Sequence, residues 1–207
     1  MLLEACYNKL AYPLLVTIVM TREIVLPSWC SDADLMEMSA QNPEMRFERN
    51  ADGTLETMAP TGGFSGNREL KAGASLLNWV ESQGLGEVFG PSTGFRLKNK
   101  AIRSPDAAFV STERLPQDWE TRQDQFLDLA PDFVIEIRSS TDSLEKLKRK
   151  MQEYIDNGVR LAWLIDRQNQ QALVYRSDGT VTQYPAGATL NGEDVVPGFT
   201  LPLSKVL

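Results

Sequence analysis

Two carboxylates and a later lysine-rich segment are the residues of this sequence best suited to do chemistry. Asp106 follows Ser104-Pro105 and opens a run of small residues, and Glu136 interrupts the apolar run Phe-Val-Ile-Glu-Ile. A carboxylate inside a core-type strand is costly unless it is paired or binds a metal. Two such carboxylates with lysines nearby suit an oxygen-ligated Mg²⁺ and a water activated for attack on a phosphate.

Each of these residues also has a purely structural interpretation. Glu136 and Arg138 lie two residues apart in the expected strand, so they share a face that water could cover. Asp106 follows a proline, where aspartate commonly forms a turn. The lysines could line a solvated helix face. Residue types alone leave these alternatives open.

The composition narrows the chemistry further, because the chain of 207 residues contains no histidine. A Ser-His-Asp triad, a histidine base and a histidine-ligated zinc are therefore excluded. Two cysteines without ligand spacing favour a reducing, cytoplasmic compartment. The formal charge of −7 argues against a nucleic-acid-coating protein, but an enzyme with a local basic groove remains compatible with it.

The elements around Glu136 are those of a crossover unit. Residues 132–138 and 160–165 are apolar runs typical of buried strands. Between them, Asp142 as N-cap with Glu145 three residues later predicts a capping box at the start of a helix. Gly158 is placed to end this helix. A helix that joins two such strands predicts an α/β domain with a mixed sheet.

The remaining segments are expected to add a helix, short strands and hairpins. Residues 67–83 are predicted to be a helix that Gly84 ends. Hairpins are predicted around Asp52-Gly53 and Asp178-Gly179. In the helix predicted over residues 67–83, the expected buried stripe consists of Leu70, Ala74, Leu77 and Val80. Further strands are expected at 87–89, 95–97 and 106–110, and a short polar helix at 115–122.

The N-terminal part is predicted to be an extension, residues 1–45, of a single domain over residues 46–207. The apolar run 10–20 is too short to span a bilayer, and no signal-peptide cleavage site follows it. It fits three interpretations: a stretch that precedes a natural start at Met20, an ordinary strand or helix, or an export signal. No membrane association is expected.

Helical periodicity narrows the cations that could serve the carboxylates. When the apolar positions of the helix after residue 142 form its buried stripe, Lys148 and Lys150 flank that stripe on opposite sides. Lys146 and Arg149 point further away. The periodicity leaves the choice between the first two open.

The motifs together resemble the Uma-type family of putative restriction endonucleases, which belongs to the PD-(D/E)XK nuclease superfamily. The resemblance rests on Ser-Pro-Asp106, on residues 131–140 (PDFVIEIRSS) and on residues 150–166 (KMQEYIDNGVRLAWLID). It extends from about Phe47 to the C-terminus. It implies a restriction-endonuclease-like α/β fold, in which helices flank a mixed β-sheet core and β-hairpins are added.

The resemblance also implies Mg²⁺-dependent hydrolysis of DNA, with Mn²⁺ as a substitute for the ion. Asp106 matches the aspartate of the PD motif and Glu136 the first acidic residue of (D/E)XK, and both would hold metal with the Ile137 carbonyl. Position 138 carries arginine where the superfamily has lysine, and arginine cannot accept a proton. In this family the lysine has moved onto the following helix, which nominates Lys150 as the third catalytic residue.

Several lesser candidates and two rival functions complete the sequence-based hypothesis. Glu48, Glu69, Asn67 and Arg138 are accessory candidates for the site. A homodimer would suit an enzyme that cuts both strands. The main rival is a catalytically inactive nuclease fold that binds DNA or protein. A glycosidase, which also needs two carboxylates, is a remote alternative.

Overall fold

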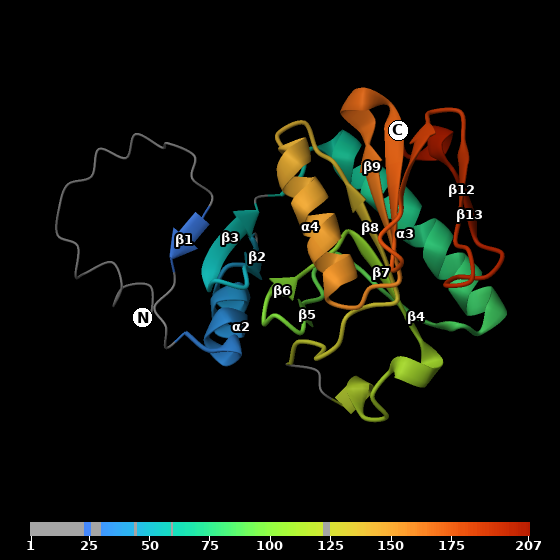
Figure 1. The fold of residues 1–207 in the computed structure, drawn as a ribbon. Coiled ribbons are helices and arrows are strands. Elements are labelled where there is room, and N and C mark those ends of the chain that lie inside the picture. The colour runs from blue at the N-terminus through green and yellow to red at the C-terminus, as the bar shows by residue number, and fades with distance from the viewer. Residues whose placement is uncertain (1–22, 26–29, 44, 59, 122–124) are drawn as a thin grey trace.

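The computed structural model describes most of the chain as a three-layered α/β structure with a smaller sheet at one side (Figure 1). The apolar run 10–20 lies outside the described residues, so the structure does not test the three interpretations of it. No helix among the described residues is long and apolar enough to cross a membrane. The described residues are 23–25, 30–43, 45–58, 60–121 and 125–207.

The main sheet has six strands in the order β11-β10-β9-β8-β7-β4. Only β8 and β9 pair in parallel, because helix α4 (Leu144–Asp156) joins them in the predicted crossover unit. All the other neighbours in this sheet are antiparallel. The strands are β4 (Gly86–Phe89), β7 (Ala107–Ser111), β8 (Phe133–Ile137), β9 (Leu161–Asp166), β10 (Gln171–Arg176) and β11 (Val181–Pro185).

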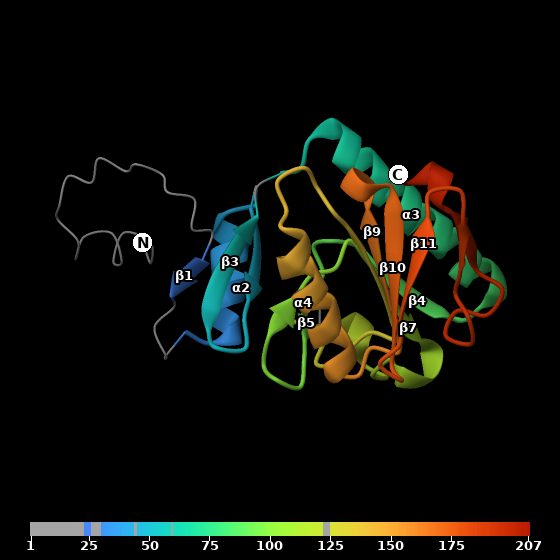
Figure 2. The ribbon, with the colours of Figure 1, turned by 45° about the horizontal axis from the view of Figure 1, so that its top comes forward.

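A five-stranded sheet lies beside α4, as Figures 1 and 2 both show. Its order is β1-β3-β2-β6-β5, and helix α2 (Asp32–Gln41) packs on it through Leu35, which contacts Leu55 and Ile102. The hairpin β2–β3 turns at Gly53, whose φ of 87° favours glycine. Its strands are β1 (Glu23–Val25), β2 (Arg46–Arg49), β3 (Thr54–Met58), β5 (Phe95–Arg96) and β6 (Ile102–Arg103).

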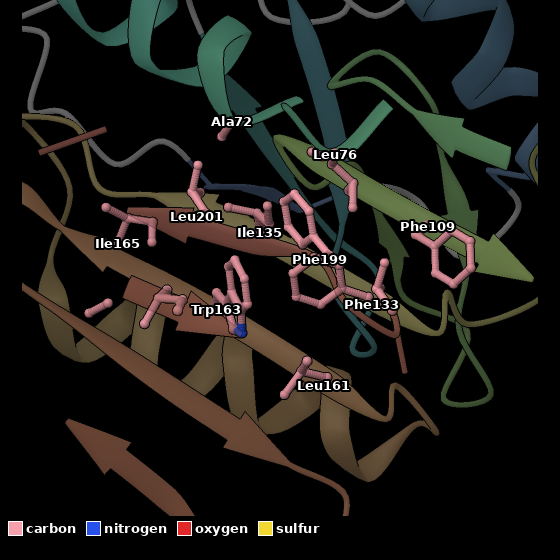
Figure 3. Packing of buried hydrophobic residues seen from close by; sticks show 14 of the residues in the cluster. Ala72, Leu76, Phe109, Phe133, Ile135, Leu161, Trp163, Ile165, Phe199 and Leu201 are labelled. Carbon is pink, nitrogen blue, oxygen red and sulfur yellow. The ribbon is translucent and has the colours of Figure 1, made fainter. Parts of the chain in front are cut away.

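The main sheet is covered by α4 on one face and by α3 (Gly63–Gln83) on the other. The α3 face holds a dense apolar cluster (Figure 3). In this cluster the Phe133 and Trp163 rings pack edge to face, with their centroids 4.7 Å apart. The short hairpin of β12 (Thr189–Asn191) and β13 (Thr200–Pro202) also packs on this cluster, through Leu190 and Leu201. The predicted α/β class, with its mixed sheet and hairpins, is confirmed.

The predicted buried stripe of α3 was correct only at Val80. The helix begins at Gly63, and its buried residues are Ala72, Leu76 and Val80. Leu70 and Leu77 are exposed, with 69% and 37% of their surface accessible. Two sets of apolar residues satisfy the helical period in this segment, so periodicity alone could not choose the face that the sheet covers.

Two local predictions near the helices were also wrong. The N-cap of α4 is Ser143, whose hydroxyl accepts from the Lys146 amide, and Asp142 instead accepts a hydrogen bond from the Ser139 amide at 2.8 Å. The polar helix expected at 115–122 is absent from the described residues 115–121, which contain only the 3-10 turn η2 (Trp119–Thr121). The 3-10 turn η1 (Thr112–Arg114) precedes this segment. Two further 3-10 turns elsewhere in the chain are η3 (Arg167–Asn169) and η4 (Leu203–Lys205).

Candidate active site

Four charged side chains meet where the two sheets and α4 come together. Glu48 comes from β2 of the small sheet, Glu136 from β8 of the main sheet and Lys150 from α4. Asp106 immediately precedes β7, the neighbour of β8. All four line one cleft, which has a volume of about 1320 Å³.

Lys150 forms the centre of this group. Its Nζ lies 2.9 Å from Glu48 Oε1 and 2.8 Å from Glu136 Oε1, so it links the two sheets. The Tyr154 hydroxyl donates a second hydrogen bond to Glu136 Oε1, at 2.8 Å. One helical turn separates Lys150 from Tyr154, and this spacing places both side chains on the face of α4 that meets Glu136.

The two carboxylates held by Lys150 are not equivalent. Burial opposes ionisation of Glu48, but Lys150 and Arg103 outweigh it and lower the pKa of Glu48. Burial raises the pKa of Glu136 above its usual value, and the nearby Glu48 charge adds to the rise. The difference arises mainly because Glu48 has Arg103 as a second cation, whereas Glu136 has the Glu48 charge beside it. The Ser104 amide, which donates to Glu48 at 2.8 Å, makes a smaller contribution.

The same contacts keep the proton on Lys150. Burial favours the neutral amine, but the two carboxylates outweigh burial and raise the pKa of Lys150 above its usual value. The side chain therefore serves the cleft as a cation and a donor rather than as a base.

Asp106 is held at the end of β8 by the backbone. Its Oδ2 accepts from the Ile137 amide at 2.8 Å, and its Oδ1 lies 3.6 Å from Arg46 Nη1. Burial, then the charges of Glu136 and Glu69, raise the pKa of Asp106 well above its usual value. Because the N–H and C=O of an extended residue point the same way, the Ile137 carbonyl is directed toward the side of Asp106.

The donor set of this cleft fits a hard divalent cation. No group of three or more acidic or soft ligands, within the part of the chain that the structure describes, already forms a complete metal site. Mg²⁺, however, commonly uses only one or two carboxylates and completes its shell with water. The mutual repulsion that raises the Asp106 pKa beside Glu136 is what such a cation would relieve.

The accessory candidates divide into two groups. Glu48 and Glu69 line the cleft, whereas Arg138 and Asn67 do not. Arg138 turns away to pair with Asp166 at 2.9 Å and to donate to the Asp142 carbonyl, so it fixes the loop after β8. Asn67 accepts a hydrogen bond from its neighbour Arg68.

The two lysines that periodicity left open lie in different surroundings. Lys150 lies in the cleft, with 14% of its side chain exposed. Lys148 is 39% exposed and pairs with Glu145, one turn earlier on the same helix.

Sequence reasoning missed a buried support network around Glu48. Arg103 donates to Glu153 Oε2 at 2.6 Å and lies 3.4 Å from Glu48 Oε2. Glu153 and Tyr154 lie in residues 150–166, one of the segments that carry the family resemblance, so this segment contained their signal. Arg103 had no comparable signal, because its partners are about 50 residues away in the sequence.

The chain is similar to known proteins in sequence and in fold. The Uma2 family model, described as "Putative restriction endonuclease", matches residues 32–204. A crystal structure of a putative nuclease belonging to DUF820 from Anabaena variabilis ATCC 29413 superimposes with a TM-score of 0.66. The two chains are 18% identical, and the match covers 77% of this chain and 88% of that one, which establishes a shared fold. No curated protein matches the chain.

Proposed function

The chain belongs to the Uma2 family of putative restriction endonucleases, and from this we propose that it is a Mg²⁺-dependent endodeoxyribonuclease. The observation that carries the proposal is the convergence of Asp106 and Glu136 on one cleft, with the Lys150 ammonium 2.8 Å from Glu136. Two carboxylates and a cation are the groups that metal-assisted phosphodiester hydrolysis requires.

In this proposal, Asp106 and Glu136 hold the Mg²⁺, together with the Ile137 carbonyl. When bound, the ion supplies a Lewis acid and a water of lowered pKa. The Ile137 amide fixes the orientation of the Asp106 carboxylate through its hydrogen bond. The Tyr154 hydroxyl does the same for Glu136. Both carboxylates are therefore positioned before any substrate arrives, which favours a defined geometry.

Lys150 has the role of an electrostatic and orienting group. Because its proton is retained, its ammonium can donate to the attacking water or to a phosphate oxygen whose charge increases during the reaction. Glu48, held by Arg103 and the Ser104 amide, keeps Lys150 directed into the cleft.

The cleft carries charges of both signs, with seven acidic residues in its lining. Arginines and lysines from four separate segments also line it, and these cations can contact the phosphate backbone of a DNA substrate. They are Arg46, Arg103, Lys146, Arg149, Lys150 and Arg167.

The proposal is tested by nicking of supercoiled plasmid by the purified chain with Mg²⁺, with Mn²⁺ and with EDTA. We expect nicking with either ion and none with EDTA, and Glu136→Gln prepared in parallel controls for contaminating nucleases. Absence of nicking with both ions would contradict the proposal and favour the inactive binding module. A second measurement, the molar mass in solution, would show whether two copies combine for cutting both strands.

A further inference from the structure

An exposed aromatic ring lies between cations at the edge of the cleft. Phe64, in the first turn of α3, has 56% of its surface accessible. The guanidinium carbon of Arg68 lies 4.3 Å from the centre of its ring and that of Arg167 lies 4.4 Å from it. We call these three residues the Phe64 cluster.

The Phe64 cluster belongs to the same cleft as the carboxylates. Phe64 and Arg167 both line that cleft, and so does Ser65, the residue after Phe64. Arg167 follows β9 directly, and its Nη1 donates to Ser65 Oγ at 3.0 Å. Figures 1 and 2 show that the start of α3 and the end of β9 lie at the same end of the main sheet. A substrate in the cleft would reach both.

The two arginines of the cluster have few polar partners. Arg68 donates to the Leu207 oxygen at 3.2 Å and to Asn67 Oδ1 at 2.8 Å. Within the described segments, neither Arg68 nor Arg167 forms a salt bridge with a carboxylate side chain, whereas Arg103 pairs with both Glu48 and Glu153. The Arg167 Nε is buried, and among the described residues it has no hydrogen-bond partner. A buried donor without an acceptor is costly, and a water molecule or a ligand in the cleft could supply the acceptor.

The local electrostatics favour an anionic ligand. Burial and the neighbouring Arg68 charge lower the pKa of Arg167, and the Glu69 charge offsets this only in part. Two cations held side by side repel each other, and a bound anion would remove this repulsion. A planar guanidinium fork binds carboxylate and phosphate by two parallel hydrogen bonds, and phosphate is the anion that a DNA substrate would bring to the cleft.

Packing does not explain Phe64. Its side chain belongs to none of the three buried apolar clusters of the described chain. An exposed planar group next to guanidinium ions is, however, the arrangement on which nucleobases stack in single-strand-binding proteins. A base can use such a surface only after it has left the duplex stack.

We propose that the Phe64 cluster binds an unpaired nucleotide of the DNA substrate, whose base stacks against the Phe64–guanidinium surface while Arg68 and Arg167 bind its phosphate. This inference rests on the proposed function, since it takes DNA as the occupant of the cleft. It specifies the substrate class as DNA that contains unpaired nucleotides beside the scissile phosphate, such as single strands, flaps or frayed ends.

The test measures binding of a fluorescein-labelled oligothymidylate of about 12 nucleotides by anisotropy, in EDTA and about 50 mM salt. Phe64→Ala should weaken binding about tenfold or more, because stacking on an aromatic ring contributes this much per base. Phe64→Trp should retain affinity within about threefold. Leu70→Ala, another exposed apolar residue of α3, is the matched control and should bind as the wild type does.

Two further measurements separate stacking from charge. An abasic strand of the same length keeps the phosphates but lacks bases, so wild type and Phe64→Ala should bind it equally. Arg167→Gln should weaken binding of both strands and reduce the slope of log K against log salt by about one, whereas Lys71→Gln, an exposed cation of α3, should leave both strands' affinities unchanged.

The outcomes distinguish this inference from the proposed function. Equal affinity of wild type and Phe64→Ala for oligothymidylate overturns the inference, even if wild type nicks plasmid. An equally large loss on a duplex of the same length also overturns it, because the contact would then not require unpaired bases. Loss confined to the single strand supports the inference, even if no nicking occurs and the nuclease proposal fails. If Phe64→Ala does not fold, Phe64→Leu replaces it.

Discussion

The two faces of strand β8 show how differently one segment can be used. Phe133, Ile135 and Ile137 point toward α3 and join an apolar cluster around Trp163 (Figure 3). On the α4 side, Val134 is followed by the charged Glu136. Alternation of side chains along a strand makes this division possible within five residues.

The two faces contribute to stability in different ways. Apolar contacts such as the edge-to-face pair of Phe133 and Trp163 stabilise the fold through burial and ring geometry. The buried charges of Glu48, Glu136 and Lys150 lose their hydration, and their mutual attraction only offsets that loss. Stability alone therefore gives no reason for three ionisable groups at this position, whereas the proposed chemistry in the cleft would.

The first test asks whether the charged face of β8 binds a metal ion or has only a structural role. Glu136→Gln and Asp106→Asn should each reduce Mn²⁺ binding below detection and abolish Mg²⁺-dependent cleavage, because each removes a charged ligand. Titration calorimetry with Mn²⁺ measures the first effect. Glu145→Gln, which removes an exposed carboxylate from α4, is the control and should bind Mn²⁺ normally. Unchanged Mn²⁺ affinity in both site variants would refute the metal assignment.

A second test compares two lysines of the same helix. Lys150→Ala should lower the single-turnover cleavage rate by about two to four orders of magnitude, the range for a positioned catalytic group. It should also destabilise the fold, because Glu48 and Glu136 then lose their shared cation. Lys148→Ala should leave the rate unchanged and stability within about 0.5 kcal/mol. Equal rates for the two variants would remove Lys150 from the mechanism.

The third test concerns the apolar face and uses two leucines of α3. Leu76→Ala should reduce the free energy of unfolding by about 2–5 kcal/mol, because Leu76 is fully buried against the sheet. Leu70→Ala should change it by no more than about 0.5 kcal/mol. Denaturant unfolding checks both. A large effect at Leu70 would mean that the face predicted from periodicity is the buried one after all.

The sequence allowed accurate prediction where a local pattern carries the information. The alternation around Glu136, and the apolar strand that ends at Asp166, predicted the crossover unit and the face on which Glu136 lies. The choice of Lys150 over Lys148 as the lysine of the site required the family resemblance, because helical periodicity allowed both. These signals are local, because strand and helix periods are properties of short segments.

Contacts between distant segments could not be predicted in this way. Arg138 is an accessory candidate by sequence, but it pairs with Asp166 at the end of the next strand and its side chain lies outside the cleft. Glu48 reaches the cleft because a second sheet places β2 beside α4. Glu48 was an accessory candidate by sequence, but no pattern in β2 predicted its contact with Lys150. Arg103 shows the same limit, since both of its carboxylate partners are remote in sequence.

The smallest expected effect concerns the pH dependence of the charged face. Burial, Glu136 and Glu69 raise the pKa of Asp106 in the folded chain above its value in the unfolded chain. The folded state thus holds this proton more tightly. The resulting stabilisation is fully present below the unfolded pKa of about 3.9 and is lost as the pH rises through the folded pKa.

Asp106→Asn cannot lose that proton and should therefore become more stable than the wild type as the pH rises from about 4 to 8. A gain of about 1 kcal/mol would raise the melting temperature by about 2–4 °C in EDTA. Added Mg²⁺ should reverse the order, because it stabilises only the chain that binds it. Asp178→Asn is the control, because hydrogen bonds from Thr180 lower the pKa of that exposed carboxyl. Asp178 therefore titrates below about pH 4, and the difference between Asp178→Asn and wild type should stay constant from about pH 4 to 8. A difference between Asp106→Asn and wild type that stays constant over this pH range would show that Asp106 is ionised throughout.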